Sequence, residues 1–313
     1  MKKIYTIADP DLSSNYHRIQ LPFDYLQQEG KTIITHDIKD ADVVCFNRFP
    51  GMHLSDFFSL KRKYGFKTIM DIDDYWRKPL LPFSVFKGFQ IEQLIRNSDY
   101  ITTTTEILYH RIRQINKNVL IIPNALPFED GQFHADRSVS DEVRFIYTGS
   151  YHNHHNIELL DALKNLNICF SAVDFGDKMQ KRPLEEIFPL KLSVKINKLP
   201  HDSYMNIYND ADCLIVPMKN TPFNQCKSNL KTLEAGCKQI PVIASKTLPY
   251  YNERDKAFID FAENNTEWYN IVKYYQENKN YVTEKGERLA EHVRQRYNLF
   301  TVNHLRSDLI NNL

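Results

Sequence analysis

Short apolar runs alternate with longer amphipathic segments along the first part of the chain. The runs are apolar on both faces, as strands of a parallel sheet buried between helices should be. The segments between them carry apolar residues at helical spacing and end at polar residues or glycine, as at Gly30. This alternation predicts βαβ units around a parallel sheet. The expected strands are 2–8, 32–35, 42–46, 66–70, 100–103 and 119–122, and the expected helices are 16–28, 54–64, 89–96 and 106–114.

The pattern restarts near residue 143, after a polar and acidic stretch over 127–141 that has no hydrophobic periodicity. Such a stretch is typical of a linker. We therefore predict one domain over residues 1–130, a linker over 131–141, a second domain over 142–297 and a final helix over 298–313. In the second half the expected strands are 143–148, 168–173, 193–196, 213–216 and 241–245, and the expected helices are 157–166, 203–209, 266–278, 281–296 and 300–311.

Composition narrows the function classes. The chain has 313 residues, enough for two domains of about 150 residues each. Its 40 basic and 39 acidic residues give a net charge of +1, so no global field attracts it to nucleic acid or to an anionic membrane. No apolar run approaches the ~20 residues of a membrane span. The five cysteines show no CxxC spacing and no signal peptide precedes the first strand, which together predict a reducing, cytoplasmic setting.

The stretch 224–245 carries more candidate chemistry than any other. It reads Asn-Gln-Cys-Lys-Ser-Asn-Leu-Lys-Thr-Leu-Glu-Ala-Gly, and it ends with Pro-Val-Ile-Ala-Ser as a short buried strand. In a helix, Lys227, Lys231 and Glu234 would share one face because they stand at i, i+4 and i+7. Amides and ammonium groups at a helix N-terminus bind phosphates, and a carboxylate further along accepts hydrogen bonds from ribose hydroxyls, so the pattern suits a nucleoside diphosphate. An ordinary surface helix with Lys–Glu pairs is the alternative for these residues alone.

Five segments in this order and spacing resemble the GT-B glycosyltransferases, in particular the retaining, family-4-like group. The likeness extends over nearly the whole chain. The segments are Ser-Asn-Tyr-His-Arg-Ile at 14–19, Met-Asp-Ile-Asp-Asp-Tyr-Trp at 70–76, Ser-Asp-Tyr-Ile-Thr-Thr-Thr-Thr at 98–105 with Ile-Pro-Asn-Ala at 122–125, Phe-Ile-Tyr-Thr-Gly-Ser at 145–150, and the element at 227–245.

The resemblance implies an α/β protein with two Rossmann-like parallel-sheet domains that face a cleft, and with C-terminal helices. It implies that residues 1–130 form the acceptor side, that 142–297 bind the nucleotide sugar, and that 298–313 pack back on the first domain. The implied activity moves a sugar from a UDP- or GDP-linked donor to a glycan or other hydroxyl acceptor, with retention of configuration. Enzymes of this class are generally metal-independent, so the resemblance implies no metal and no other cofactor.

The resemblance places the donor site in the second half. Glu234 is expected to bind the donor ribose, and Lys227 with Ser228 the diphosphate, whose negative charge grows as the glycosidic bond breaks. A glycine at position 149 would let the backbone approach a phosphate, although a plain turn glycine explains it equally well. The expected donor-binding residues are Gly149, Ser150, His152, Asn224, Lys227, Ser228 and Glu234, and of these Lys227 and Glu234 are also expected to act in catalysis.

Three histidines, His152, His154 and His155, suggest a metal site at first sight. No carboxylate or cysteine nearby completes a ligand set at a familiar spacing. We therefore expect these side chains to line the cleft near the diphosphate and to bind no metal.

Acceptor-side residues are expected at predicted strand ends in the first half. Asp73 or Asp74 would orient an acceptor hydroxyl, or cap the turn that follows. His17 and Asp73 are the catalytic candidates of this half. Arg18, Arg48 and Asp74 are the further acceptor-side candidates, and Arg18 is expected to reach a phosphate.

Two further positions bear on the interpretation. Most family-4-like enzymes carry two glutamates eight positions apart; Glu234 matches the second, whereas Cys226 stands at the first. A thiol cannot replace the hydrogen bonding of a carboxylate, so the resemblance does not carry the first glutamate's contact with the donor sugar over to Cys226. Asn124, in the Pro-Asn turn, is expected to be structural and to terminate its strand.

Three functions follow from these observations. The first is a glycosyltransferase in the synthesis of a surface glycan or polysaccharide. The second is a viral glycosyltransferase that modifies hydroxylated bases in DNA, which the net charge of +1 disfavours because duplex binding needs a basic footprint. The third is a non-catalytic nucleotide or sugar binder of the same fold, which Cys226 motivates.

Overall fold

The chain divides into two compact units, and each unit is assembled from separate segments. The predicted boundary at residue 130 and the predicted linker 131–141 both lie within unit 2. A computed structural model describes residues 1–313 except 10–11, 78–81, 150 and 175–181. Unit 1 comprises Met1–Ala125, Gln225–Ser228 and Leu299–Leu313, and unit 2 comprises Leu126–Asn224 and Asn229–Asn298.

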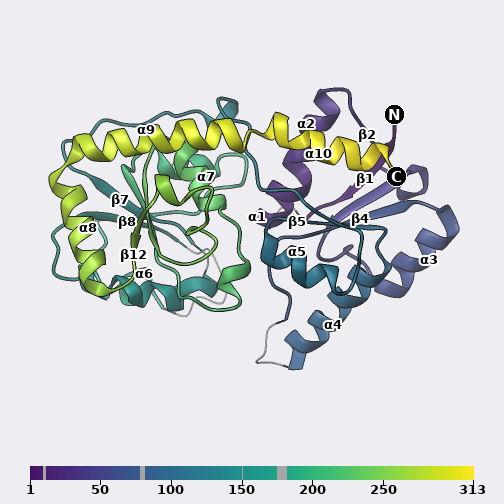
Figure 1. The fold of residues 1–313 in the computed structure, drawn as a ribbon, viewed down its shortest axis with the longest axis horizontal. Coiled ribbons are helices and arrows are strands. Elements are labelled where there is room, and N and C mark those ends of the chain that lie inside the picture. Colours follow the sequence, from purple (N-terminus) through teal and green to yellow (C-terminus); the bar gives the residue numbers. More distant parts are fainter. Residues whose placement is uncertain (10–11, 78–81, 150, 175–181) are drawn as a thin grey trace. The chain divides into compact units, whose positions relative to one another are not determined.

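Unit 1 is built on a six-stranded parallel sheet with the strand order β2-β1-β3-β4-β5-β6 (Figure 1). The direction in which strands are added reverses between β1 and β3, so this is the topological switch point of the sheet. Parallel strands need crossover connections, which the intervening helices supply. The strands are β1 (Lys3–Ile7), β2 (Ile33–Ile34), β3 (Val43–Asn47), β4 (Lys67–Ile72), β5 (Tyr100–Thr103) and β6 (Val119–Ile121).

Helices cover both faces of this sheet, because alternate strand residues point to opposite sides. Val44 and Phe46 of β3 pack with α3, α4 and α5 on one side. Val43 and Cys45 pack with α2 and α10 on the other side. The helical elements are α1 (Ser13–Asn15), the π-helix η1 (Tyr16–Gln20), α2 (Leu21–Gln28), η2 (Ile38–Asp40), α3 (Leu54–Tyr64), α4 (Pro82–Asn97), α5 (Glu106–Arg113) and α10 (Leu299–Asn311).

Helix α10 joins unit 1 although it follows the last helix of unit 2 in sequence (Figure 1). Leu309 and Ile310 pack in the same apolar cluster as Phe23 and Leu26. The side-chain amide of Asn303 donates to the carbonyl of Pro22 at 2.9 Å. This bond joins α10 to the first turn of α2 and fixes where α10 lies on it.

Unit 2 has a second six-stranded parallel sheet, with the order β12-β11-β10-β7-β8-β9. Counted from β7, this is the doubly wound order 3-2-1-4-5-6, and its switch point lies between β7 and β10. The sequence pattern missed the short edge strand β12. The strands are β7 (Arg144–Tyr147), β8 (Cys169–Val173), β9 (Val194–Ile196), β10 (Cys213–Val216), β11 (Val242–Ser245) and β12 (Asp260–Ala262).

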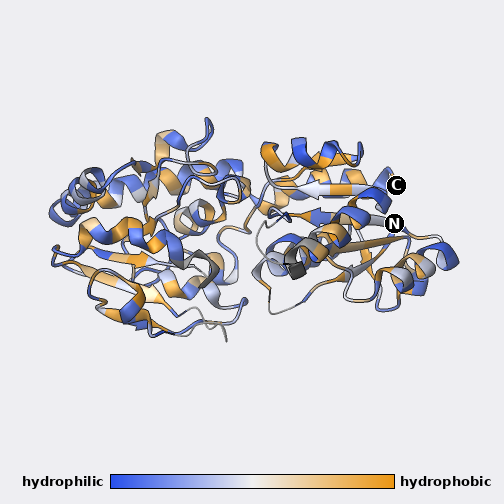
Figure 2. Ribbon diagram, turned by 90° about the horizontal axis from the view of Figure 1, so that it is seen from below, coloured by the Kyte–Doolittle hydropathy of each residue, from blue (hydrophilic) through white to orange (hydrophobic). Residues whose placement is uncertain are grey.

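Several helical elements of unit 2 are short or tightly wound. The predicted helix 157–166 is instead a 3₁₀-helix, η4, that begins at Tyr151. Figure 2 shows hydrophilic and hydrophobic residues alternating along most helices, as expected where one face is buried. No helix among the described residues combines the length and the apolar character that crossing a bilayer requires. The remaining elements are η3 (Gly131–Phe133), η4 (Tyr151–Leu163), α6 (Leu184–Ile187), η5 (Tyr204–Tyr208), η6 (Asn224–Cys226), α7 (Leu230–Cys237), η7 (Lys256–Phe258), α8 (Asn265–Glu277) and α9 (Lys279–Arg296).

Helices α7 and α9 pack closely because a glycine on each faces the other segment. A Cβ atom added at Gly236 would lie 2.4 Å from Cγ2 of Val293. One added at Gly286 would lie 2.1 Å from the carbonyl oxygen of Gln239. Both distances are shorter than any van der Waals contact, so the approach of α9 to α7 depends on the missing side chains.

We expect Gly286→Ala to lower the free energy of unfolding by about 1–3 kcal/mol, because the methyl group meets a backbone carbonyl that cannot turn aside. In an exposed helix the same change would stabilise by ~1 kcal/mol. Glu284→Ala, on an exposed position of the same helix, is the matched control. Thermal unfolding of the native protein, Gly286→Ala and Glu284→Ala tests this expectation. A melting temperature of Gly286→Ala at or above the native value would contradict the packing described.

Candidate functional site

A polar network gathers at the switch point of unit 2. Thr148 directly follows β7, and its hydroxyl oxygen lies 3.0 Å from that of Tyr208. The Tyr208 hydroxyl donates to Oε2 of Glu234 at 2.6 Å, and the Lys231 ammonium donates to the same oxygen at 2.9 Å. The Glu234 residue is 1% exposed. The network therefore places a buried carboxylate at the carboxyl end of β7, where open parallel sheets bind ligands.

Lys231 is held as a cation in this network. Burial alone would lower the pKa of Lys231, but the Glu234 carboxylate beside it holds that pKa well above its ordinary value. Burial raises the pKa of both tyrosines, so they remain neutral hydrogen-bonding groups at neutral pH. An ammonium and a carboxylate thus lie side by side at the end of the strand, with neutral hydroxyls around them.

Helix α7 supplies Lys231 and Glu234 but does not include Lys227. The helix begins at Leu230, so the prediction that Lys227, Lys231 and Glu234 share one helix face is wrong for Lys227. Residues 225–228 belong to unit 1, where the side chain of Cys226 is buried in the core. The chain returns to unit 2 at Asn229, one residue before α7 begins.

Gly149 lies beside the network, immediately after Thr148. A Cβ atom at position 149 would lie 2.6 Å from the Tyr147 hydroxyl oxygen, so close packing is one reason for a glycine there. Ser150 lies outside the described residues. For His152 and His154 the structure describes the backbone alone, within η4. The donor roles of Ser150 and His152 therefore stay predictions.

Asn156 anchors the loop that follows β10. Its Oδ1 accepts from the backbone N–H of Lys219 at 3.0 Å and from Nδ2 of Asn224 at 3.3 Å. Nδ2 of Asn224 also donates to the Lys219 carbonyl at 2.8 Å. Asn224 is fully buried, so in this structure its amide shapes the loop that leads toward α7.

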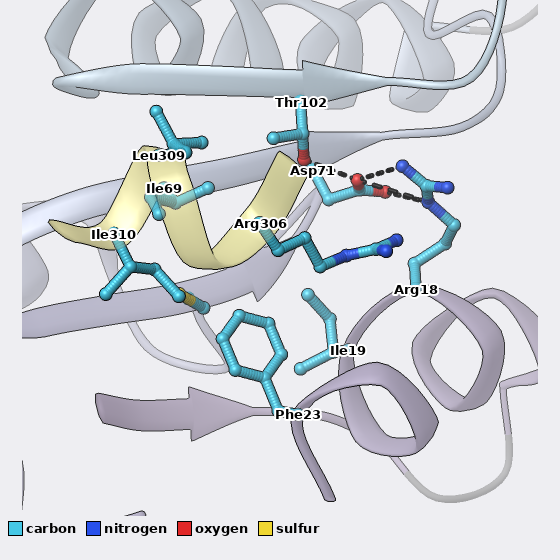
Figure 3. Close-up of a pocket in the computed structure, with 10 residues that line it drawn as sticks. Arg18, Ile19, Phe23, Ile69, Asp71, Thr102, Arg306, Leu309 and Ile310 are labelled. Atoms are coloured by element: carbon cyan, nitrogen blue, oxygen red, sulfur yellow. Dashed lines mark hydrogen bonds and ion pairs between the residues drawn. The ribbon is translucent and has the colours of Figure 1, made fainter. Parts of the chain in front are cut away.

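In unit 1 the carboxyl edge of the sheet is organised around Asp71 of β4 (Figure 3). Arg18 donates from Nη2 to Oδ2 of Asp71 at 2.7 Å and from Nε to Oδ1 at 3.0 Å. The Thr102 hydroxyl donates to Oδ2 at 2.6 Å. Nη1 of Arg18 donates to the Ile122 carbonyl at 2.8 Å and to Oδ1 of Asn124 at 3.1 Å. All three guanidinium nitrogens of Arg18 are therefore engaged inside the unit, and the expected contact of Arg18 with a phosphate stays a prediction.

Asn47 extends this network to the end of β3. Its Nδ2 donates to Oδ1 of Asp71 at 3.1 Å and to Oδ1 of Asp73 at 3.0 Å, and its Oδ1 accepts from Nε of Arg48 at 3.1 Å. Arg48 has a left-handed φ of 59°, which is costly for a residue with a side chain. Its Nη2 donates to the Ser14 hydroxyl at 2.7 Å. The structure thus brings the predicted acceptor-side residues Asp73 and Arg48 together near the switch point of unit 1.

The segment 225–228 is bonded to the same edge of unit 1. Nδ2 of Asn124 donates to the Ser228 hydroxyl oxygen at 2.7 Å. The Lys227 ammonium lies 3.8 Å from Oδ2 of Asp74. Burial raises the pKa of Asp74 by more than the Lys227 charge lowers it. The two predicted diphosphate ligands, Lys227 and Ser228, therefore belong to unit 1, whereas Glu234 belongs to unit 2.

Cys226 and His17 are both buried in unit 1. Cys226 packs in the apolar cluster that contains Trp76 and Ile91, and burial raises the pKa of its thiol. The residue at the position of the family's first glutamate is thus a core side chain. His17 lies in the π-helix η1 with its ring edge-on to Tyr16, the ring centroids being 5.1 Å apart. Its catalytic role stays a prediction.

Arg306 is a buried cation that no motif in the sequence marks. It lines a cavity of about 10 Å³ with Phe23, Cys45 and Asp71 (Figure 3). Burial lowers the pKa of Arg306 to about 9, and the positive charge of Arg18 adds to this effect. Helical spacing could have indicated its burial. Residue 306 lies on the same face of α10 as the buried residues 299, 302, 303, 309 and 310.

Metal-ligating side chains do not cluster in the described part of the chain. No group of three or more His, Cys, Asp and Glu side chains there could hold a metal ion. Asp71, Asp73 and Asp74 instead bond to Arg18, Asn47 and Lys227 respectively.

Comparison with solved structures identifies the fold. No protein-family model and no curated protein matches the sequence. The two doubly wound units give the chain the GT-B fold of glycosyltransferases. Sucrose-phosphate synthase from Thermosynechococcus elongatus matches with a TM-score of 0.73 and 14% identity, over 100% of this chain and 99% of that one.

Two further structures show the same fold. Anabaena Alr3699/HepE in complex with UDP-glucose matches with a TM-score of 0.70 and 11% identity over 100% of both chains. The DNA-modifying enzyme β-glucosyltransferase, solved with and without its substrate uridine diphosphoglucose, matches with a TM-score of 0.64 and 10% identity. That match covers 99% of this chain and 98% of the other. At such low sequence identity, these structural matches establish the fold alone. The activity has to be argued from the residues.

We expect Arg18→Met to lower the free energy of unfolding by about 3–5 kcal/mol, because it leaves the Asp71 carboxylate buried without its principal partner. Arg48→Met, whose guanidinium is about one-third exposed, is the control and should cost less than ~1 kcal/mol. Urea unfolding measures both. If Arg18→Met keeps full stability and raises only the KM for the donor or the acceptor, Arg18 is the substrate ligand predicted from the sequence.

Proposed function

We propose that this protein is a glycosyltransferase that moves a sugar from a nucleoside-diphosphate sugar to an acceptor hydroxyl. The observation that carries the proposal is the Glu234–Lys231–Tyr208 network at the β7/β10 switch point of a GT-B unit. Ligands of doubly wound sheets bind at this point, outside the carboxyl ends of the strands. The HepE structure holds UDP-glucose on the same fold, which supports a UDP-linked donor here as well.

Glu234 is the proposed ribose ligand. A carboxylate has about four lone-pair sites on two oxygens, and Tyr208 and Lys231 both bond to Oε2, so Oε1 suits a ribose hydroxyl. Lys231 is hydrogen-bonded to Glu234 in the structure, and its flexible side chain would turn toward a phosphate when the donor enters. That movement exchanges one anionic partner for another, so the ammonium keeps a counter-charge throughout.

Lys227 and Ser228 are the proposed diphosphate ligands, and Gly149 lets the backbone approach the donor. Fixed donors aimed at the diphosphate stabilise the transition state more than the ground state, because negative charge grows on the leaving group. His17 and Asp73 are the proposed acceptor-side groups, with Asp73 held in place by Asn47. We propose attack from the face that the leaving group vacates, which retains the anomeric configuration. In this scheme cationic side chains, and no metal ion, stabilise the charge on the diphosphate. Transfer should therefore continue in the presence of EDTA.

We expect Glu234→Gln to lower kcat/KM for the donor about 10- to 100-fold, because an amide cannot supply the charge-assisted hydrogen bonds of a carboxylate. Glu291→Gln, on an exposed position of α9, is the matched control and should leave activity unchanged. A panel of UDP- and GDP-sugars, screened first by thermal shift and then by nucleotide release, supplies the donor for the assay.

The panel also separates this proposal from its alternatives. Glu234→Gln activity equal to that of the native protein would remove Glu234 from the site. Nucleotide binding without release or transfer from any sugar donor, with acceptors present, would favour the non-catalytic binder.

Two classes of acceptor are candidates for the proposed transfer. A surface glycan or polysaccharide is the first, since a chain with a net charge of +1 has no global attraction to DNA. A hydroxylated base in DNA is the second, and the match to the DNA-modifying β-glucosyltransferase over 99% of this chain favours it. Glycan acceptors and hydroxymethylated duplex DNA are therefore to be tested side by side.

Salt distinguishes the two acceptors. If DNA is the acceptor, we expect kcat/KM to fall about 100-fold or more between 50 and 200 mM salt, because phosphate contacts release condensed counterions. Transfer to a neutral glycan should change little over the same range. Activity on DNA without a steep salt slope would show that the duplex is not bound through its phosphates.

A further inference from the structure

Asn124 stands between a residue that can only donate hydrogen bonds and a residue that can do either. Nη1 of Arg18 lies 3.1 Å from Oδ1 of Asn124, and Nδ2 of Asn124 lies 2.7 Å from the Ser228 hydroxyl oxygen. A guanidinium has no acceptor, so the atom of Asn124 that faces Arg18 must be its oxygen. The ion pair with Asp71 fixes Arg18, and this in turn fixes which way round the amide lies.

The orientation of the amide determines how Ser228 is used. Nδ2 carries only hydrogens, so in this contact the Ser228 oxygen accepts. The single hydroxyl hydrogen of Ser228 is then directed to another acceptor. A diphosphate at neutral pH presents acceptor oxygens. A Ser228 hydroxyl that accepts from Asn124 can therefore donate its own hydrogen to one of these oxygens.

We propose that Asn124 is a positioning residue that sets the direction of the Ser228 hydroxyl so that it donates to a diphosphate oxygen of the donor. This inference rests on the proposed function, and it gives Asn124 a role beyond ending β6. The two hydrogen bonds point the same way: Arg18 donates to Asn124, and Asn124 donates to Ser228. Each group is buried or half-buried in unit 1, so water competes poorly with these bonds.

Asn124→Asp tests the direction of the bond with a side chain of nearly the same shape. An aspartate keeps the contact with Arg18 but has no hydrogen for Ser228. The Ser228 hydroxyl would then donate to the carboxylate and turn its hydrogen away from the ligand. We expect the affinity for UDP to fall about tenfold, as when a hydrogen bond to a charged group is lost. Ser228→Ala alone should cause a loss of similar size.

A double-mutant cycle separates direction from charge. If Asn124 acts through Ser228, Asn124→Asp in the Ser228→Ala background should change UDP affinity less than about twofold. If the new carboxylate merely repels phosphate or distorts the turn, the loss is equally large in both backgrounds, and the proposal fails. Asn124→Ala, measured in the same two backgrounds, repeats the cycle without the added charge and covers the case in which the aspartate variant does not fold.

A control variant before β6 and a set of three ligand probes separate this inference from the proposed function. Asn118 precedes β6 as Asn124 follows it, so Asn118→Asp adds the same charge at the other end of the strand and should leave UDP affinity unchanged. Calorimetry with UDP, GDP and inorganic pyrophosphate is done on the full chain. Native protein that binds UDP while Asn124→Asp binds it equally well would overturn the inference and leave the function standing. Native protein that binds none of the three probes would overturn both.

Discussion

The buried ion pair between Arg18 and Asp71 is the interaction on which the functional edge of unit 1 depends. It joins the π-helix η1 to strand β4, and the other donors of Arg18 reach the carbonyl of Ile122 and the amide of Asn124 at the end of β6. A single side chain thus sets the spacing of three elements. A buried carboxylate is tolerated only where such partners surround it, and Asp71 has four: Arg18, Asn47, Thr102 and the nearby charge of Arg306.

Unit 2 also holds a buried carboxylate, but its cationic partner is a lysine instead of an arginine. Its carboxylate, Glu234, sits on a helix and is matched by a lysine one turn before it on that helix. Lysine has a flexible stem and a point charge, whereas arginine presents a rigid planar fork. The pair in unit 1 is therefore suited to hold a framework, and the pair in unit 2 is suited to exchange partners when a ligand arrives.

The alternation of apolar and amphipathic segments predicted the fold class because that pattern is local. Each parallel strand is apolar along its own length, and each covering helix repeats its apolar residues every turn. Domain boundaries depend on contacts between segments that are distant in the sequence. Residues 127–141 lack periodicity, as a linker does, yet they belong to unit 2, and no local pattern shows that Cys226 enters the core of unit 1.

The candidate site was predictable only where a motif marks it. Glu234 and Gly149 stand in recognisable segments, and the structure places both at one strand end. Tyr208, Thr148 and Asn47 contribute through contacts across long stretches of sequence, which neither periodicity nor composition records. Arg306 could be inferred only as a cation on an apolar helix face, because its neighbours Arg18 and Asp71 lie hundreds of positions earlier.

The interleaving of the two units also constrains how the chain acquires its structure. Helix α10 closes one face of the first sheet, but its residues are synthesised after the whole of unit 2. The N-terminal sheet therefore emerges from the ribosome with that apolar face covered by α2 but not by α10, and it stays so for more than half of synthesis. Unit 2 can complete its own core first, so the N-terminal half of this protein is the part that most needs protection by chaperones during translation.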